Sequence, residues 1–439
     1  MILFLKTEKV KEASNQDSSG QFRKENILYL IIKLFLGKHQ NSKFDDLRFW
    51  VAKFRIGNTA NKEKVKYSVY KIDVFNKNAE DKHMAQQNWS DKISNAAQIG
   101  GIETAVMDNG FGRGTRIAWI NTGTGLRYKV VIDRAMDIAD AFYNQHSLTW
   151  LSHSGITFPE PFSSRGIDWL RTFGGGLLTT CGLTHVGGPE LDSNGERGLH
   201  GPISNSPAEI ESIIQPDPIA GKMEMSITGK IKQTSVFGPS LELRRTISGS
   251  LGEPFINIHD EVINRGNTVV PHMILYHFNF GWPLVNEGTD IIWEGAWRAR
   301  DEGGNNKIFQ ERNNYQKCPA PLEEHSGGGE EAAIIDPISD NFGNYICGLH
   351  NQEIGIAVAL KLKKKQLPWL TNWQHWGKGE YVTGLEPGTN PPIGQAKARK
   401  QNTLLFLSPG ERKTYDLNIE VLNNQAQIKN FLKNNNQEN

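Results

Sequence analysis

From about residue 98 onward, the chain consists of short runs in which apolar and polar residues alternate, and this alternation restricts the fold more than any other feature. In residues 126–133, every second side chain is apolar and two of the intervening ones are basic, as in a strand with one buried face. Gly, Asn, Asp and Pro separate the runs, and no spacing typical of βαβ units occurs. The pattern predicts antiparallel β structure and disfavours a parallel α/β fold.

Successive runs beyond residue 205 form a meander that is joined by the turn sequences PDP, GPS, GEP and NRG. Residues 301–336 are rich in Gly, Asn and Glu without clear periodicity, so we expect a long surface excursion there. Together the runs predict one large all-β sandwich over residues 91–425. The expected strands of the meander and of the later part are residues 208–215, 222–232, 240–248, 255–264, 345–350, 354–362, 403–407 and 414–421.

The two ends of the chain differ in composition from this central part. Residues 1–90 are rich in Lys, Asn, Gln and Asp and poor in Gly, so they are expected to be an appended extension that is helical or disordered. Short helices are predicted at residues 24–36 and 44–54. An accessory domain, an arm, and a translated upstream region before a functional start near Met84 all fit this composition. Residues 426–439 are an amide-rich polar tail, in which a short helix is one option and to which the sequence assigns no function.

The composition excludes several classes of partner. Lys and Arg total 49 against 48 for Asp and Glu, and no basic stripe is evident that would bind nucleic acid or an anionic membrane. The longest apolar run, residues 27–37, is shorter than the about 20 residues that span a bilayer, and it lies too late for a secretion signal. The sequence therefore predicts a small neutral molecule as partner, with no nucleic acid and no membrane.

Cysteine spacing and short motifs limit the chemistry. Cys181, Cys318 and Cys347 are far apart and form no CxxC pair, so reduced thiols and a cytoplasmic location are expected. The glycine-rich sequences at 110–114 and 173–176 lack the P-loop lysine, and neither HExxH nor GxSxG occurs. We expect no metal and no cofactor.

Residues 174–205 are dense in Gly and carry His185 and His200. Because Gly adopts positive φ and lets a ligand approach the main chain, this stretch suits the wall of a pocket. It equally suits a turn-rich connection between strands. For His185 two roles stay open, since it could line the pocket or hydrogen-bond within the loop.

The run HMILYHFNFG at residues 272–281 is the most informative predicted strand. Tyr276, Phe278 and Phe280 share one face, which suits a core between sheets. His277 and Asn279 share the opposite face, where two polar groups need partners. A buried structural histidine and a functional face both account for them.

Glu386 follows an aromatic run, WLTNWQHW at residues 369–376, that includes Trp373 and Trp376. Aromatic residues at this density are core residues or the flat platform on which the C–H faces of a sugar stack. A carboxylate and an imidazole facing a neutral ligand suit proton transfer, because one takes a proton while the other gives one. The candidates from the residues alone are Glu386 and His277 for catalysis, and His200, Asn279, His185, Trp373 and Trp376 for substrate binding.

Five motifs occur in the order expected of a known superfamily. They are DRAMDI around Arg134, FGGGLLTTCGLTHVGGP, GLHGPISN around His200, LYHFNFGWPL around His277 and GLEPGTN around Glu386. In this respect the chain resembles the galactose mutarotase-like superfamily, and within it the aldose 1-epimerase-like branch known mainly as a domain of unknown function. The resemblance covers about residues 98–421.

The resemblance implies an antiparallel β-supersandwich whose concave face binds a sugar, and an isomerase that needs no cofactor. It implies that Glu386 is the base on the anomeric hydroxyl and that His277 is the acid on the ring oxygen. His200 and Arg134 correspond to sugar-binding residues. For the acid and base pair, the ordinary pKa values are about 6.5 for a histidine such as His277 and about 4.3 for a glutamate such as Glu386. These values suit a protonated imidazole and an ionised carboxylate.

Three departures from the superfamily pattern stand beside the resemblance, the first being that the superfamily's sugar-contacting aspartate has no match among these motifs. Tyr276 takes the place of an Asn before the acid histidine, and Pro202 takes the place of a Gly after Leu-His-Gly. Two other functions therefore stay open. One is a non-catalytic carbohydrate-binding module, and the other is a different proton-transfer reaction on a modified sugar such as a uronate or keto sugar.

Overall fold

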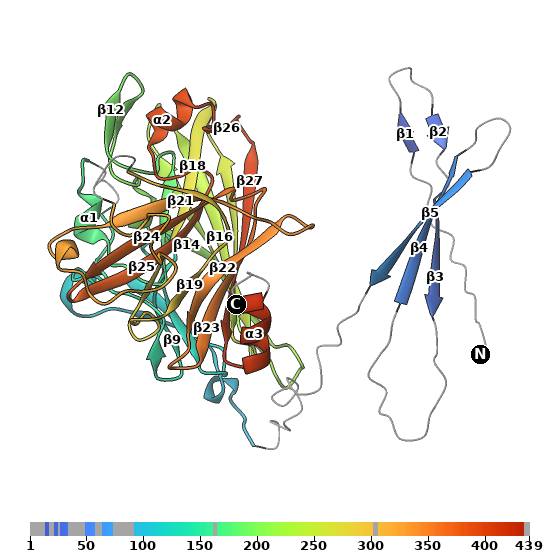
Figure 1. Ribbon diagram of the computed structural model, residues 1–439, viewed down its shortest axis with the longest axis horizontal. Helices are drawn as coiled ribbons and strands as arrows, with labels where there is room; N and C mark the ends of the chain where they lie inside the picture. The colour runs from blue at the N-terminus through green and yellow to red at the C-terminus, as the bar shows by residue number, and fades with distance from the viewer. Residues whose placement is uncertain are drawn as a thin grey trace. The chain divides into compact units, whose positions relative to one another are not determined.

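The computed structural model describes residues 92–433, except 161–164 and 302–305, together with the backbone of five strands nearer the N-terminus. The chain divides into two compact units, Met1–Gln87 and Asn88–Asn439 (Figure 1). The proposed start near Met84 and the end of the tail beyond residue 433 lie outside the described residues.

The strands of the first unit correct a prediction. The segments expected to be helical contain strands, because β3 lies within residues 24–36 and β4 begins within residues 44–54. The physical reason is local, since ILYLIIK in β3 is rich in β-branched and aromatic residues and has no helical periodicity. β1 pairs antiparallel with β2, and β4 lies between β3 and β5 in an antiparallel sheet. The bounds are β1 Ser14–Gln16, β2 Phe22–Lys24, β3 Ile27–Lys33, β4 Phe49–Gly57 and β5 Lys64–Ile72.

The second unit is an antiparallel sandwich of two large sheets, which confirms the predicted all-β fold (Figure 1). The twelve-stranded sheet has the order β20-β21-β24-β25-β18-β11-β9-β8-β7-β6, with β10 beside β9 and β26 beside β18. Its strands are β6 Gly101–Val106, β7 Arg116–Asn121, β8 Leu126–Val131, β9 Asp137–Tyr143, β10 His146–Ser147, β11 Leu178–Leu183, β18 Val270–Gly281, β20 Gly295–Ala299, β21 Glu331–Pro337, β24 Trp369–Gly377, β25 Glu380–Gly388 and β26 Leu405–Leu407.

The eight-stranded sheet has the order β14-β15-β16-β17-β27-β23-β22-β19. Its first four strands are the predicted meander, which is therefore confirmed as one set of neighbouring strands. The bounds are β14 Ala208–Ile214, β15 Glu224–Thr234, β16 Ser240–Ser250, β17 Phe255–Asn264, β19 Asp290–Ile292, β22 Asn344–Asn351, β23 Ile356–Lys363 and β27 Arg412–Leu422.

Few other elements interrupt the sandwich. A hairpin of β12 and β13 projects from the glycine-rich stretch, and the described helices are short. None of these helices has the length and apolar character needed to span a bilayer. The bounds are β12 Glu190–Asp192, β13 Gly195–Arg197, α1 Trp169–Thr172, α2 Gln395–Lys400, α3 Gln425–Lys433 and the 3-10 turns Ala96–Gln98, Gly110–Gly112, Ile203–Asn205 and Glu323–His325.

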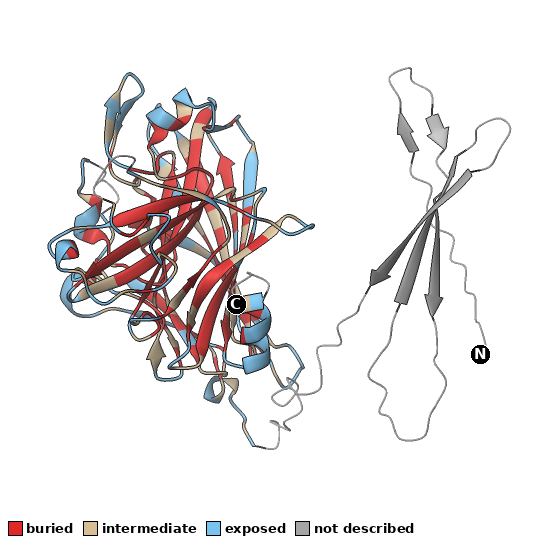
Figure 2. Ribbon diagram, viewed as in Figure 1, coloured by how far each residue is buried: buried red, intermediate tan, exposed pale blue. Residues whose placement is uncertain are grey.

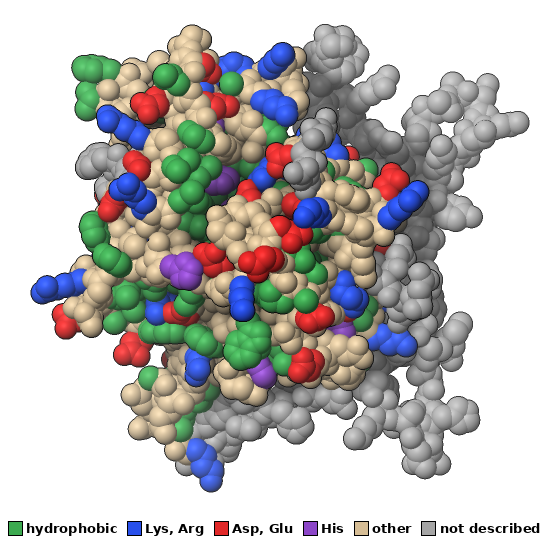
Figure 3. Space-filling view, turned by 60° about the vertical axis from the view of Figure 1, so that its left-hand side comes forward, with side chains coloured by type: hydrophobic (Ala, Val, Ile, Leu, Met, Phe, Trp, Pro, Cys, Tyr) green, Lys and Arg blue, Asp and Glu red, His purple; other side chains and the backbone are tan. Residues whose placement is uncertain are grey.

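The main core lies between the two sheets, where the strands are buried (Figure 2). Tyr276, Phe278 and Phe280 on β18 are fully buried in it, which confirms the face predicted for them. The alternate face of β18 carries His277 and Asn279 on the other side of the twelve-stranded sheet. On the part of the molecular surface that Figure 3 shows, acidic, basic and apolar side chains are interspersed. The strand that carries a candidate acid thus has one face in the core and one face available for a site.

The predicted surface excursion over residues 301–336 is shorter than expected. β21 begins at Glu331 and pairs with both β20 and β24, with Ala333 and Ile335 in the core. The run EAAIIDP is too short for a clear period, so its burial is decided by the neighbouring strands.

Candidate functional site

A histidine and a carboxylate meet on one face of the twelve-stranded sheet. The register Phe278↔Leu385 between β18 and β25 puts His277 beside Glu386, with Nε2 and Oε1 3.2 Å apart. The two residues are only 6% and 3% exposed, respectively. Strand pairing therefore joins the two residues predicted for catalysis.

His200 lies next to this pair, and its ring centroid is 6.1 Å from that of His277. The His200 backbone has φ of +57°, which a non-glycine residue seldom adopts, and its N–H donates to the Gly187 carbonyl. Gly201 follows because a Cβ there would lie 2.4 Å from the Gly182 carbonyl oxygen. Nδ1 of His200 is buried without a hydrogen-bond partner. The glycine-rich stretch thus holds an imidazole with one uncommitted nitrogen against the pair.

Aromatic rings surround the imidazole of His277. The ring of Phe173 lies 5.3 Å and that of Trp373 5.4 Å from it, the latter nearly perpendicular. Trp169 stacks on Phe173 at 4.3 Å, and Trp150 contacts Trp373 edge-on at 6.2 Å. Of these residues only Trp373 was predicted from the sequence. Phe173 begins a quoted motif but was not singled out, and Trp150 and Trp169 come from segments with no distinctive motif, so their positions depend on the tertiary fold.

Arg134 supports the wall of the site, and its hydrogen bonds go to residues other than His277 and Glu386. Its guanidinium donates to the carbonyl oxygens of Ser204 and Thr172 and to the hydroxyl of Thr157. Burial lowers the pKa of Arg134 to about 10. The side chain also borders a cavity of about 40 Å³ together with Thr179, the strand partner of His277. Arg134 fastens the loops that carry His200 and Trp169.

Asn279 is fully buried two residues beyond His277 on the same face. Its side-chain amide donates to the carbonyl oxygens of Gly176 and His277, each at 3.0 Å, while its Oδ1 has no hydrogen-bond partner. The donor side of Asn279 is therefore occupied by the backbone, and this residue anchors the strand next to the site.

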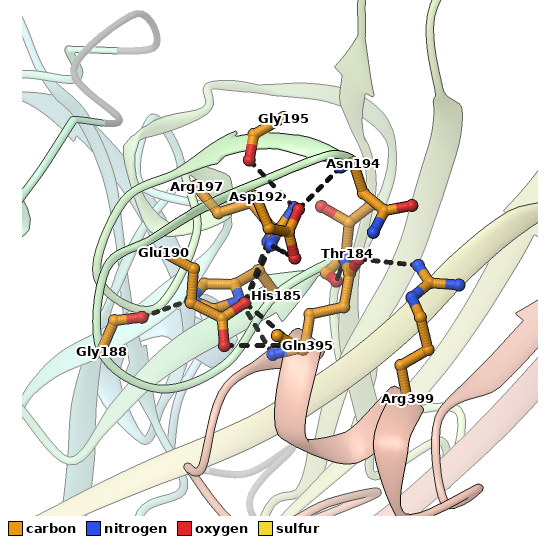
Figure 4. A network of polar contacts seen from close by, with 11 residues as sticks. Thr184, His185, Gly188, Glu190, Asp192, Asn194, Gly195, Arg197, Gln395 and Arg399 are labelled. Carbon is orange, nitrogen blue, oxygen red and sulfur yellow. Dashed lines mark hydrogen bonds and ion pairs between the residues drawn. The ribbon is translucent and has the colours of Figure 1, made fainter.

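The structure corrects the prediction for His185. Its Nε2 lies 2.7 Å from the Gly188 carbonyl oxygen, and its Nδ1 accepts from the Gln395 N–H at 3.3 Å (Figure 4). Glu190 joins the same network through Arg197 and the start of α2. Both ring nitrogens are engaged, so His185 ties the β12–β13 hairpin to α2.

Trp376 is the second residue whose predicted role in substrate binding the structure corrects. It lies three residues beyond Trp373 on β24, so its side chain points to the opposite face of the sheet. It is fully buried in the main core, where its ring contacts Tyr381 at 4.8 Å and its N–H donates to Gln374. Trp376 is a core residue.

Two charged residues at the site were missed by the sequence analysis. Arg300 follows β20 and Glu330 precedes β21, and their side chains form an ion pair of 2.8 Å. Oε2 of Glu330 also accepts from the indole N–H of Trp373 at 2.6 Å. Glu330 lies in the stretch expected to be a surface excursion, and Arg300 immediately precedes that stretch. No motif marks them, so only the pairing of β20, β21 and β24 reveals them.

Burial reverses the expected protonation of the pair. It raises the pKa of Glu386 to about 8, with Glu330 adding to the shift and Arg300 opposing it. It lowers the pKa of His277 to about 3, with a smaller opposing influence from Asn279, and it lowers the pKa of His200 well below its ordinary value. The directions of both shifts oppose a protonated imidazole and an ionised carboxylate in the free site. Between these two pKa values the pair holds one proton.

Metal and thiol chemistry have little support at this site. Within residues 92–433, apart from the two undescribed gaps, no group of three His, Cys, Asp or Glu is arranged to hold a metal ion. Cys181 lies on β11 in the apolar cluster beside the site, and burial raises the pKa of its thiol well above the ordinary value.

Comparisons with known proteins agree with this architecture. The family model described as "Domain of unknown function (DUF4432)" matches residues 112–421. A Klebsiella pneumoniae protein, provisionally assigned as an aldose 1-epimerase, is 22% identical with a TM-score of 0.68, covering 79% of this chain and 93% of its own. A galactose mutarotase-like protein from Clostridium acetobutylicum is 12% identical with a TM-score of 0.51, covering 74% and 100%.

At these identities the likeness to the two solved structures shows the fold alone. None of the curated proteins matches the chain. The family model, in contrast, spans both sheets and all the motifs from Arg134 to Glu386. The chain therefore belongs to the DUF4432 family and has the galactose mutarotase-like fold.

Proposed function

We propose that this chain is a carbohydrate isomerase of the aldose 1-epimerase type, which opens and recloses a sugar ring by proton transfer at His277 and Glu386. The observation that carries the proposal is the buried pair itself, with Nε2 and Oε1 3.2 Å apart beneath aromatic rings. An acid and a base at this distance can exchange protons with two oxygens that are bonded to the same carbon, here the anomeric hydroxyl oxygen and the ring oxygen.

The pair needs one proton for this chemistry. Ring opening removes a proton from the anomeric hydroxyl and delivers one to the ring oxygen. The resemblance assigns the first step to Glu386 and the second to His277. Burial makes Glu386 the resting proton holder, so the proton passes to His277 before ring opening. After rotation about the bond between the first two carbons, the reversed transfers close the ring as the other anomer, and the pair again holds one proton.

The remaining residues bind and orient the sugar in this proposal. Phe173 and Trp373 offer apolar surfaces to the C–H faces of the ring. The uncommitted Nδ1 of His200 hydrogen-bonds a hydroxyl, while Arg134 and Asn279 keep the walls in place. The partner is a free sugar or a close derivative. The cysteines are unpaired and buried, which supports a reducing, cytoplasmic setting.

Exchange between anomers, followed by NMR over a panel of sugars, tests the proposal. Glu386→Gln and His277→Asn are each expected to lower the exchange rate by roughly 100-fold or more, since each removes one proton-transfer group. Glu420→Gln, which removes an exposed ion pair with Lys361 on the other sheet, is the control and should keep full activity. Undiminished exchange by a folded Glu386→Gln protein would falsify the proposal.

Other outcomes of the same panel separate the alternatives. Sugar binding without exchange, in the unmodified chain, indicates a carbohydrate-binding module. A new product from a uronate or keto sugar, which depends on Glu386, indicates a different proton-transfer reaction at the same pair.

A further inference from the structure

A chain of side-chain contacts leads from the rim of the site to the catalytic pair. Arg300 Nη2 contacts Glu330 Oε1 at 2.8 Å, and Glu330 Oε2 accepts from Trp373 Nε1 at 2.6 Å. Each oxygen of Glu330 thus has its own partner. The side chains of Arg300 and Glu330 are 27% and 40% exposed, so the rim pair lies where solvent and the buried site meet.

Trp373 forms the link between the rim and the pair. Its ring lies 5.4 Å from that of His277 at 72°, and it packs over Gly384, where a Cβ would lie 3.3 Å from Trp373 and 2.9 Å from Glu386 Oε1. The indole therefore lies against His277 and borders the same Gly384 position as the Glu386 carboxylate. Its orientation is held at one end by the carboxylate of Glu330.

We propose that Glu330 is a positioning residue that fixes the indole of Trp373 against the pair, and that the opposite charges of Glu330 and Arg300 jointly set how readily Glu386 gives up its proton. This inference rests on the proposed function only where it concerns turnover. The effect on Glu386 itself is measurable without a substrate.

The charged and titratable groups that act on Glu386 come from several elements. His277 faces it from β18, and Cys181 on β11 interacts with its charge. Glu330 from the approach to β21 raises the pKa of Glu386, whereas Arg300 at the end of β20 lowers it. Burial lowers the pKa of His277 and raises that of the Cys181 thiol, which favours the neutral form of both, so the opposing influences on Glu386 that remain are those of Glu330 and Arg300.

Substitutions at the rim should therefore shift the titration of Glu386 in opposite directions. Glu330→Gln keeps an acceptor for the Trp373 indole but removes the negative charge, so the pKa of Glu386 should fall by roughly half a unit. Arg300→Gln removes the positive charge, so the pKa should rise by a similar amount. Loss of stability or of packing alone does not produce two shifts of opposite sign.

An infrared titration of the Glu386 carboxyl band measures this directly in the full chain, with the band assigned by its loss in Glu386→Gln. The same variants should move the alkaline limb of the pH–rate profile, which reports loss of the pair's proton, downward for Glu330→Gln and upward for Arg300→Gln. Trp373→Phe removes the indole hydrogen bond together with part of the ring that packs against His277, and it should lower kcat without moving that limb. The control, Glu420→Gln, should move neither.

The outcomes separate this inference from the proposed function. Opposite infrared shifts in a chain without isomerase activity leave the inference intact and remove the function. Isomerase activity with no infrared shift beyond that of the control, or with two shifts of the same sign, overturns the inference and leaves the function in place. A drop in kcat for Glu330→Gln as large as that for Trp373→Phe also counts against it, since Gln keeps the acceptor.

Discussion

At the residue scale, Gly384 shows how closely the site is packed. It lies on β25 two positions before Glu386, and any side chain there meets the carboxylate, the Trp373 ring and the Phe278 carbonyl. The last of these is backbone and cannot move aside at low cost. The sheet therefore reserves this position for a residue without a Cβ.

Gly384→Ala is expected to lower the exchange rate by roughly 100-fold, because the new methyl group displaces Glu386 or Trp373 from the pair. Its fold should persist, as judged by circular dichroism. Gly188→Ala, where nothing lies within 4 Å of the added carbon, is the matched control and should retain activity. Equal rates in the two variants would show that the position of Glu386 tolerates displacement.

The titration of His277 and Glu386 makes the free energy of unfolding depend on pH. Between pH 4.5 and about 8 the folded chain keeps a proton on Glu386 that the unfolded chain has released, so this group lowers stability as pH rises. Between about 3 and 6.5 the folded chain lacks a proton on His277 that the unfolded chain binds, so stability rises with pH. The two contributions cancel from pH 4.5 to 6.5.

From pH 6.5 to 8 the Glu386 contribution stands alone and should cost about 2 kcal/mol of unfolding free energy. Glu386→Gln removes the titrating group, so its stability should decline less over this range. Urea unfolding at half-unit pH steps measures the difference between the two proteins. Identical slopes would mean that Glu386 titrates at its ordinary pKa.

At the scale of elements, α3 turns a polar tail into part of the fold. Two apolar residues spaced three apart, Ile428 and Phe431, are buried against β22 and β23, and a Cβ at Gly348 would lie 3.0 Å from the Phe431 ring. The rest of the helix is mostly exposed. The polar composition of the segment thus conceals a narrow apolar stripe.

Phe431→Ala should reduce the free energy of unfolding by about 3–5 kcal/mol, because it removes a buried ring and leaves a cavity. Gln427→Ala, on the exposed side of the same helix, should change stability by less than about 0.5 kcal/mol. Denaturant unfolding of both variants gives the comparison. A small effect at Phe431 would indicate that α3 docks only weakly.

At the scale of the whole molecule, a buried arginine connects the two sheets. Arg245 on β16 is fully buried, and it pairs with Asp260 on β17 and with Asp137 on β9 of the other sheet. Tyr276, next to His277, donates its hydroxyl to Asp260. Asp137 in turn accepts from Thr180 on β11. One cation thus neutralises two acids between the layers behind the site.

Arg245→Met should cost about 3–5 kcal/mol of unfolding free energy, since it leaves two buried carboxylates without their cation. The neighbouring Arg244 points to the opposite face and pairs with the partly exposed Glu211, so Arg244→Met should cost less than about 1 kcal/mol. Thermal and denaturant unfolding measure both. Equal losses of unfolding free energy in the two variants would mean that the contacts of Arg245 between the sheets contribute no more to stability than a surface ion pair.

The sequence by itself determined the class of the fold and the two faces of β18, because a strand repeats every two residues and that period is visible locally. It also located Glu386, His277 and His200 through their motifs. Local composition failed for the first unit, where a β-prone apolar run was predicted to be helical, and for α3, whose apolar stripe is only two residues wide.

Only the tertiary structure decided which residues meet. The register of β18 with β25 joins His277 to Glu386, and the pairing of β20, β21 and β24 carries Arg300 and Glu330 to the same face. The protonation of the pair also depends on burial, which no single segment encodes. Strand register and depth of burial are set by contacts between segments far apart in the chain, and for that reason the sequence names the acid and the base while the fold determines which of them holds the proton.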